Sequence, residues 1–412
     1  MSNTSRSTIA NQDRSGAPTS QNSPSVRPFL LVCAAYLLLM ELAAVFLLFP
    51  SGLAQRLDFR NLYAGGVLVR TDRASLYDPG RQKEVEDAFV SRSAGVLSFV
   101  RPPYEALLFA PFSLASYRAG YLCLMAFNCL LILLCFFLLR SVFSGTDAPW
   151  QPRPGLMFFA FLPTAIAIVQ GQDSILFLLI CCLAYRELTR AREFRAGCFL
   201  ALSLFKFQIA LPLALLLAAR HGRRFLAGFA LGASVVAAVS LSVIGLRGVG
   251  PFRQLLLNIS LAGAPANGDM LAVSPAAMPN IRGLLYVVAG RYIPHTPFLV
   301  LVLALSLALL VWAARAARSS PGDDAAFALS IVSALLVSYH VHAQDLTLLL
   351  LPIALVGRQE YGVVSKICRL FFLLPPIFIL MGPEAISLLS LLLLAFGFMI
   401  SSQPRTAVAG TA

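Results

Sequence analysis

Long uninterrupted apolar runs constrain the fold of this chain more than any other feature of its sequence. Runs of about 18 or more apolar residues with few charges are long enough to cross a bilayer as helices. Backbone groups in hydrocarbon must be hydrogen-bonded within the protein, and barrel strands are shorter and alternate in polarity. Helical spans are therefore expected at Pro28–Phe49, Tyr117–Leu139, Phe225–Ile244, Pro297–Ala314 and Glu384–Ile400.

The composition indicates which solvent the surface faces. Of the 412 residues, 58% are hydrophobic and only 12% are charged, whereas soluble globular chains carry about 25% charged residues. So few charges cannot cover a water-exposed surface of this size, and lipid must cover it. We therefore predict an all-α, polytopic transmembrane helix bundle with about ten or eleven spans and short re-entrant helices, in the cell (inner) membrane.

The distribution of basic residues orients the chain. The formal net charge is +13, but Lys and Arg gather in short connections, without the interleaved aromatics or zinc-finger spacing of a nucleic-acid-binding protein. The positive-inside rule places these connections and the N-terminus in the cytoplasm. Residues 1–27 and 402–412 are then cytoplasmic tails, the first predicted to be disordered. Residues 28–401 form one transmembrane domain whose long loops, 50–116 and 246–296, lie on the other side.

One segment has two interpretations. Ala196–Ala219 has the length of a single span, yet both of its ends are strongly basic. Either it crosses once, which reverses the orientation of everything after it, or it forms a hairpin of two short helices that turns near Lys206–Gln208. Lys206 interrupts the apolar run and Pro212 weakens helix continuity, which favours the hairpin.

With the hairpin, the uncommon polar residues converge on one side of the membrane. Four polar features fall toward the non-cytoplasmic face: Asp58, the Gly171–Asp173 turn, Lys206 and the His340–Asp345 turn. A Lys at the centre of a membrane helix costs about 2.5–3.5 kcal/mol, so such residues are functional candidates. The convergence predicts a shared reaction pocket on the non-cytoplasmic side.

The first long loop carries most of the recognisable motifs. It opens with Leu57-Asp-Phe-Arg-Asn-Leu-Tyr and continues with Leu-Tyr-Asp78-Pro79. Asp78 can cap a helix that has Pro79 at its first position, so a surface helix is predicted over Gly80–Arg92. The loop closes with Phe99-Val-Arg-Pro-Pro-Tyr-Glu-Ala-Leu-Leu-Phe-Ala-Pro.

In order and spacing, these motifs resemble glycosyltransferase family 87, integral membrane enzymes of the GT-C class. Members have an Asp-Phe start after the first helix, then Leu-Tyr-Asp-Pro, then an aromatic residue with Pro-Pro, Leu-Leu and Pro. A Gly-Gln-x-Asn/Asp turn, a Leu-x-x-x-Lys and a late His follow. This chain has Gly171-Gln172-Asp173, Leu202 to Lys206 and Tyr339 to His342 in that order, and the resemblance covers roughly residues 55–360. Arg101 departs from it, because an aromatic residue often precedes the double proline.

The resemblance implies transfer of a hexose such as mannose, or a pentose, from a polyprenyl-phosphate donor to a lipid or glycan acceptor, with inversion at the anomeric carbon. Asp58 is the expected catalytic base. Lys206, His342 and Arg101 are expected to bind the donor phosphate, since a leaving phosphate needs cationic stabilisation. Further candidates for substrate contact are His340, Gln172, Asp173, Asn280 and Arg282.

Each of these assignments also has an interpretation without chemistry. Asp58 can be an interfacial charge near Arg56 or Arg60. Lys206 can snorkel or form a structural ion pair, and the two histidines can be satisfied polar residues at a helix end. Their i, i+2 spacing does not put both on one helix face.

Several motifs are absent from the sequence. No Asp-x-Asp, Gly-rich P-loop or serine-nucleophile elbow occurs, and the eight cysteines lie in apolar segments or at their edges, without metal-type pairing or a disulfide framework. We therefore expect no metal, no cofactor and no nucleic acid, and the donor, the acceptor and membrane lipids as partners. The leading alternative is a transporter or flippase for a lipid-linked or polar solute. A membrane polymerase or ligase acting on undecaprenyl-linked glycans and a structural membrane subunit are the others.

Overall fold

The chain is helical throughout the part that the computed structural model describes, and no β-strand occurs in that part. This confirms the all-α bundle that the apolar runs predict. The two predicted cytoplasmic tails fall almost wholly outside the described residues. Those residues are 27–55, 57–89, 97–143, 160–261, 274–290, 292–320, 322–357 and 363–402.

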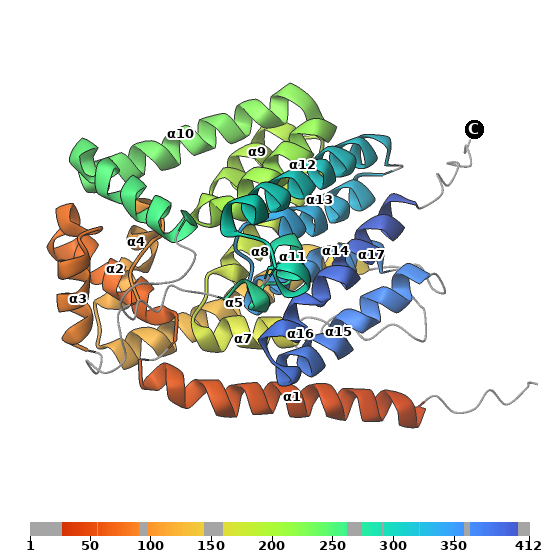
Figure 1. The fold of residues 1–412 in the computed structure, drawn as a ribbon, viewed down its shortest axis with the longest axis horizontal. Coiled ribbons are helices and arrows are strands. Elements are labelled where there is room, and N and C mark those ends of the chain that lie inside the picture. Colours follow the sequence, from red (N-terminus) through yellow and green to blue (C-terminus); the bar gives the residue numbers. More distant parts are fainter. Residues whose placement is uncertain are drawn as a thin grey trace, which may run out of the picture.

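The helices pack into one bundle, with α1 running across one side and the long α10 across the opposite side (Figure 1). Short 3-10 segments, labelled η, separate several of the α-helices. In chain order the elements are α1 (Arg27–Leu53), α2 (Phe59–Thr71), η1 (Arg73–Ser75), α3 (Pro79–Asp87), α4 (Pro103–Phe109), η3 (Ala110–Ser113), α5 (Tyr117–Phe143), α7 (Leu162–Gln170), α8 (Ser174–Leu188), α9 (Glu193–Ala201), η4 (Leu204–Lys206), α10 (Phe207–Leu261), η5 (Pro275–Ala277), α11 (Ile281–Ala289), α12 (His295–Ser319), α13 (Asp323–Val337), η6 (Ala343–Leu349), α14 (Leu350–Val356), α15 (Val363–Met381), α16 (Pro383–Ser387) and α17 (Leu389–Ser401).

Five of the described helical segments are long and apolar enough to cross a membrane, fewer than the ten or eleven spans expected. Several other apolar helices are shorter, and α8 and α13 have 15 residues each. The longest segment is also not one straight helix, because Gly222 and Gly245 interrupt α10 with non-helical backbone angles. The five segments are Val32–Leu53, Tyr117–Arg140, Leu204–Leu257, His295–Ser319 and Pro383–Ser401.

Apolar side chains cover the outside of the bundle as well as filling its centre. No residue of α1 from Val32 to Pro50 is buried, and Phe46 is 79% exposed. At the centre, α13 is buried from Ala325 to Leu336 and packs against α10, α12, α14 and α17. A surface that is as apolar as the core is the surface of a protein solvated by lipid.

The segment with two interpretations is a hairpin. A Cβ on Gly228 would lie 1.9 Å from the carbonyl oxygen of Phe194, and one on Gly232 would lie 2.6 Å from the Cβ of Ala201. Thus α9 and the part of α10 after Gly222 run side by side in the same direction, and the first part of α10 must run the opposite way. The turn of this hairpin contains η4, and therefore Lys206.

The first long loop folds into a compact unit against α5. Asp78 caps α3 as predicted, accepting a hydrogen bond of 2.8 Å from the backbone N–H of Arg81. This helix ends at Asp87, earlier than the predicted Arg92, which lies outside the described residues. Aromatic side chains of α2 pack against those of α5, and they include Phe59, Tyr63, Tyr117 and Tyr121.

Candidate active site

The turn between α7 and α8 is the element around which the polar residues gather. Gly171 ends α7 with a φ of 67°, a left-handed conformation that favours glycine. A Cβ on this residue would lie 2.8 Å from the Cβ of Phe59, the first residue of α2. Glycine is required here for both reasons, and the close contact brings Gln172 next to Asp58.

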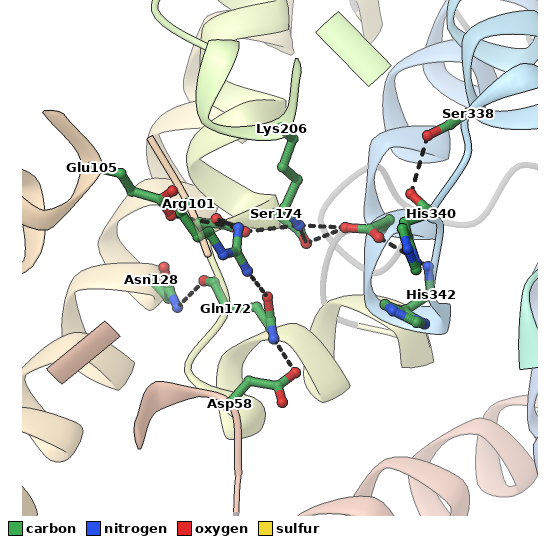
Figure 2. A network of polar contacts seen from close by, with 12 residues as sticks. Asp58, Arg101, Glu105, Asn128, Gln172, Ser174, Lys206, Ser338, His340 and His342 are labelled. Atoms are coloured by element: carbon green, nitrogen blue, oxygen red, sulfur yellow. Dashed lines mark hydrogen bonds and ion pairs between the residues drawn. The ribbon is translucent and has the colours of Figure 1, made fainter. Parts of the chain in front are cut away.

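Asp58 stands at the N-cap of α2 but does not cap it. An aspartate in this position normally accepts a hydrogen bond from the first helical turn, and Asp58 accepts none there. Arg60, its candidate partner in the sequence, instead forms a buried ion pair with Glu86, Nε to Oε2 3.1 Å. The partly exposed carboxylate of Asp58 accepts a hydrogen bond from the side-chain amide of Gln172 (Figure 2). Within the described residues, no ion pair involves Asp58.

Gln172 connects Asp58 to the cations of the site. Its Nε2 donates to Asp58, and its Oε1 accepts from Arg101 Nη2 at 3.4 Å. Its backbone carbonyl accepts a hydrogen bond of 3.0 Å from Asn128, a buried residue of α5. Because both ends of the Gln172 amide are used, its orientation is set by its neighbours and in turn fixes the carboxylate of Asp58.

Asp173 holds two cations at once. Its carboxylate forms ion pairs with Arg101 and, at 2.7 Å, with Lys206 Nζ. Burial alone would raise the pKa of Asp173, but the nearby Arg101 and Lys206 outweigh it and lower the pKa below its ordinary range. The Asp173 side chain is fully buried, so this aspartate is an ionised counter-ion inside the protein.

Lys206 makes a second ion pair on the opposite side of its amine. Its Nζ pairs with Asp345 and donates to Ser174 Oγ at 2.7 Å, and Ser174 in turn donates to Asp345 at 2.9 Å. Lys206 is 3% exposed. The amine therefore does not snorkel, and the structural ion pair considered in the sequence is present, with two carboxylates as its partners.

Asp345 links this cluster to the two histidines. Its other oxygen accepts a hydrogen bond of 2.9 Å from the backbone N–H of His342. His340 and His342 lie in the non-helical turn before η6, with ring centroids 6.3 Å apart. Helical spacing therefore does not apply to them, and both rings lie at one end of the network (Figure 2). Burial, helped by His342 and Arg282, lowers the pKa of His340 to about 3, so this imidazole is neutral.

The second long loop reaches the same turn. Asn280 caps α11 by accepting from Gly283 N–H at 2.8 Å, and its amide donates to the carbonyl of Ser338 at 2.7 Å. Arg282 donates to the carbonyl of Tyr339 at 3.3 Å, and its guanidinium lies 3.8 Å from the centroid of the Tyr339 ring. The two long loops thus approach one cluster, from opposite ends of the network.

Glu105 also belongs to this network, although no role was predicted for it from the sequence. It is fully buried, and neither carboxyl oxygen accepts a hydrogen bond from any described residue. Arg101 Nη1 lies 3.5 Å from Glu105 Oε1, and the Asp173 carboxylate is a further charged neighbour. Burial, opposed by Arg101 and reinforced by Asp173, raises the pKa of Glu105 well above its ordinary value. Glu105 is therefore a buried acid whose protonated form is favoured by its surroundings.

We expect Glu105→Gln to fold and Glu105→Ala to lose stability, because only glutamine keeps a donor of the same shape beside Asp173. A raised pKa in the folded state stabilises the protein fully below the ordinary glutamate value of about 4.3, and this contribution is lost as pH rises through the raised pKa. Melting temperatures measured against pH should therefore show the glutamine variant gaining on the wild type as pH rises. A constant difference would show that Glu105 is ionised.

The arrangement brings together all the site residues predicted from the sequence. It also adds three that were not predicted to belong to it: Glu105, Asn128 and Ser174. An acid within the apolar stretch that follows the double proline was a usable signal for Glu105, whereas Asn128 and Ser174 carried none.

Within the described residues, no group of three or more His, Cys, Asp and Glu side chains is arranged to hold a metal ion. A separate groove of 520 Å³ on the face of α8, α9 and α10 has a mainly apolar lining that includes Phe199 and Val235, and none of the network residues.

The apolar exterior and the buried charge network define a helical membrane protein with a polar site between its two long loops. Residues 99–352 match the profile of Glycosyltransferase family 87. This match covers more than half of the chain, and the protein belongs to that family. It is therefore a membrane glycosyltransferase, and a sugar donor and an acceptor are its substrates. No curated protein and no solved structure matches the chain.

The range that matches the family profile includes most of the site residues but not Asp58. It contains Arg101, Glu105, the Gly171–Asp173 turn, Lys206 and the histidine turn, but it begins after Asp58. The case for Asp58 therefore depends on its contacts in this chain and on its resemblance to the family's opening motif.

Proposed function

We propose that this enzyme transfers a hexose such as mannose, or a pentose, from a polyprenyl-phosphate donor to a lipid or glycan acceptor, with inversion at the anomeric carbon. Asp58 is the base. The reaction takes place at the non-cytoplasmic face of the cell (inner) membrane, in a multi-pass protein whose N-terminus is cytoplasmic. The transporter or flippase alternative does not fit a family of glycosyltransferases.

The observation that carries this proposal is the difference between Asp58 and the other carboxyl groups of the network. Asp173 and Asp345 are buried and neutralised by cations, and Glu105 is buried in surroundings that favour its protonated form. Asp58 is partly exposed, has no cation partner among the described residues and is oriented by an amide. Of the four groups, it alone is partly exposed and outside any ion pair among the described residues, so a substrate hydroxyl can reach it, as a general base requires.

The chemistry needs one base and one stabilised leaving group. The acceptor hydroxyl oxygen attacks the anomeric carbon from the side opposite the phosphate, and its proton passes to Asp58. The bond between the anomeric carbon and the phosphate oxygen breaks, and the polyprenyl phosphate leaves with the electron pair. Because a phosphate leaves as a stable anion, positive charge near it supplies most of the stabilisation and no protein acid is required.

The direct test uses purified protein and a panel of polyprenyl-phosphate sugars, with lipid-linked products followed by mass spectrometry. We expect one donor sugar to be transferred and polyprenyl phosphate to be released in equal amount. Transfer from nucleotide sugars, with none from any polyprenyl-phosphate sugar, would contradict the proposed donor class.

Replacing Gln172 should slow the reaction without weakening donor binding, because the amide orients Asp58. Gln172→Ala should lower kcat about tenfold to a hundredfold and change KM little, as expected when a catalytic group is misaligned. Gln170, the last residue of α7, makes none of the network contacts described above, and Gln170→Ala serves as the control. A large rise in KM with an unchanged kcat would instead assign Gln172 to substrate binding.

A further inference from the structure

Arg282 is a buried cation without a carboxylate partner. Its residue exposure is 8%, and no described Asp or Glu forms an ion pair with it. Its contacts are the carbonyl and the ring of Tyr339, and its Nε has no hydrogen-bond partner among the described residues. A buried charge costs several kcal/mol unless it is paired, and the carbonyl and ring of Tyr339 offset this charge only in part.

Arg101 and Lys206, unlike Arg282, have carboxylate partners among the described residues. Arg101 pairs with Asp173, and Lys206 pairs with Asp173 and Asp345. The charges of the two cations and the two aspartates cancel, and Glu105 adds no positive charge. This part of the network is balanced before any substrate arrives, so an incoming phosphate gains less from it than the sequence suggests.

The two histidines belong to the turn that Arg282 contacts through Tyr339. His342 interacts electrostatically with Asp58, and His340 interacts with both His342 and Arg282. The Nε2 of His340 is buried and has no hydrogen-bond partner among the described residues. A neutral imidazole can carry its proton on this nitrogen. His340 and Arg282 both lie against the Tyr339 ring, and each has one nitrogen without a hydrogen-bond partner among the described residues.

We propose that the phosphate of the lipid-linked donor binds to Arg282 and His340, with His342 beside it, rather than to Lys206 and Arg101. The inference depends on the proposed donor class and changes the assignment made from the sequence. The sugar then lies between the phosphate and Asp58, with the histidines lining its path. Lys206, Arg101 and the two aspartates form the rigid support that orients Gln172 and the histidine turn.

Binding of a short product analogue tests this directly. Citronellyl phosphate is titrated into detergent-purified full-length protein, and citronellol, which has the same chain without the charge, is titrated as the reference. We expect the wild type to prefer the phosphate and Arg282→Gln to weaken phosphate binding about tenfold to a hundredfold, leaving citronellol binding unchanged. Arg195→Gln removes an exposed arginine and should behave as the wild type.

A charge-balanced variant tests the alternative assignment. Lys206→Met combined with Asp345→Asn removes one cation and one anion, so the network stays neutral while the Lys206 amine is lost. We expect the phosphate affinity of this double variant to stay within about threefold of the wild-type affinity. A tenfold loss would correspond to about 1.4 kcal/mol of binding free energy. Loss of phosphate affinity in this double variant, with Arg282→Gln unaffected, would overturn the inference and restore Lys206 as the phosphate ligand.

Two further readouts separate ligand binding from folding. If Arg282 serves the ligand, the melting temperature of ligand-free Arg282→Gln should not fall, because an unpaired buried charge has been removed. A clear fall would show a structural role and count against the inference. Arg282→Lys keeps the charge but loses the planar donors and the ring contact, and it should bind the phosphate several-fold more weakly than the wild type.

Failure of the donor class gives a different result from failure of the site. If the wild type binds citronellyl phosphate no better than citronellol, the proposed donor is wrong and the inference is overturned with it. If the wild type prefers the phosphate and Arg282→Gln retains that preference, only the phosphate site is wrong.

Discussion

Asp58→Asn should abolish sugar transfer while leaving the protein folded and in the membrane. Asparagine keeps the shape of the side chain and can still contact Gln172, but it cannot take a proton from the acceptor. Loss of a general base lowers rates by a factor of about 10² to 10⁴. Initial rates with the donor identified from the polyprenyl-phosphate panel measure the effect, and detergent-extracted yield and melting temperature check the fold.

A matched substitution in the same loop provides the control. Asp87 lies at the end of α3 and forms an i, i+4 ion pair with Lys83, so Asp87→Asn changes the charge of the loop without touching the network. Its rate should equal that of the wild type within a factor of about two, since exposed pairs contribute little. Transfer by Asp58→Asn at a comparable rate would remove Asp58 as the base.

Lys206→Met should damage the fold as much as the activity. Methionine fills a similar volume, but it leaves the carboxylates of Asp173 and Asp345 facing each other inside the protein. Removing one partner of a buried ion pair costs about 3–5 kcal/mol. We expect a large drop in the yield of monodisperse protein and in melting temperature, measured in the same detergent as the wild type.

The loss should be repaired by removing one of the two carboxylates. Lys206→Met combined with Asp345→Asn restores neutrality, and the asparagine oxygen can still accept the hydrogen bond from the backbone N–H of His342. Recovery of most of the lost melting temperature is expected. If the double variant is as unstable as the sum of the two single variants, the charges act independently and the network is not a coupled unit.

The sequence predicted the fold class, and it predicted which polar residues lie close together, for reasons that are local in the chain. Apolar runs identify membrane helices whatever they pack against, as α1, α5 and α12 illustrate. The hairpin around Lys206 followed from basic residues at both ends of one run, and the cap at Asp78 from a two-residue pattern. Shorter helices such as α8 and α13 were harder to predict, because they are buried by neighbours that no local pattern identifies.

Pairing within the site could not be predicted from the sequence. Lys206 and Arg101 were assigned to the donor phosphate because isolated cations in an apolar chain suggest a bound anion. The structure shows that Asp173 and Asp345 neutralise them, and those contacts join segments that are far apart in the sequence. The converse holds for Arg282, which has no carboxylate partner in the described part of the chain, and this becomes visible only once its neighbours in space are known.

The position of Asp345 along the chain has a consequence for biosynthesis. Arg101, Asp173 and Lys206 are synthesised first, and together they carry one excess positive charge. The carboxylate that cancels it follows Lys206 by 139 residues. A nascent chain that has not yet delivered the segment around Asp345 therefore holds an uncompensated cation in its half-assembled bundle, and truncation before this residue should expose the enzyme to quality-control proteolysis in the membrane.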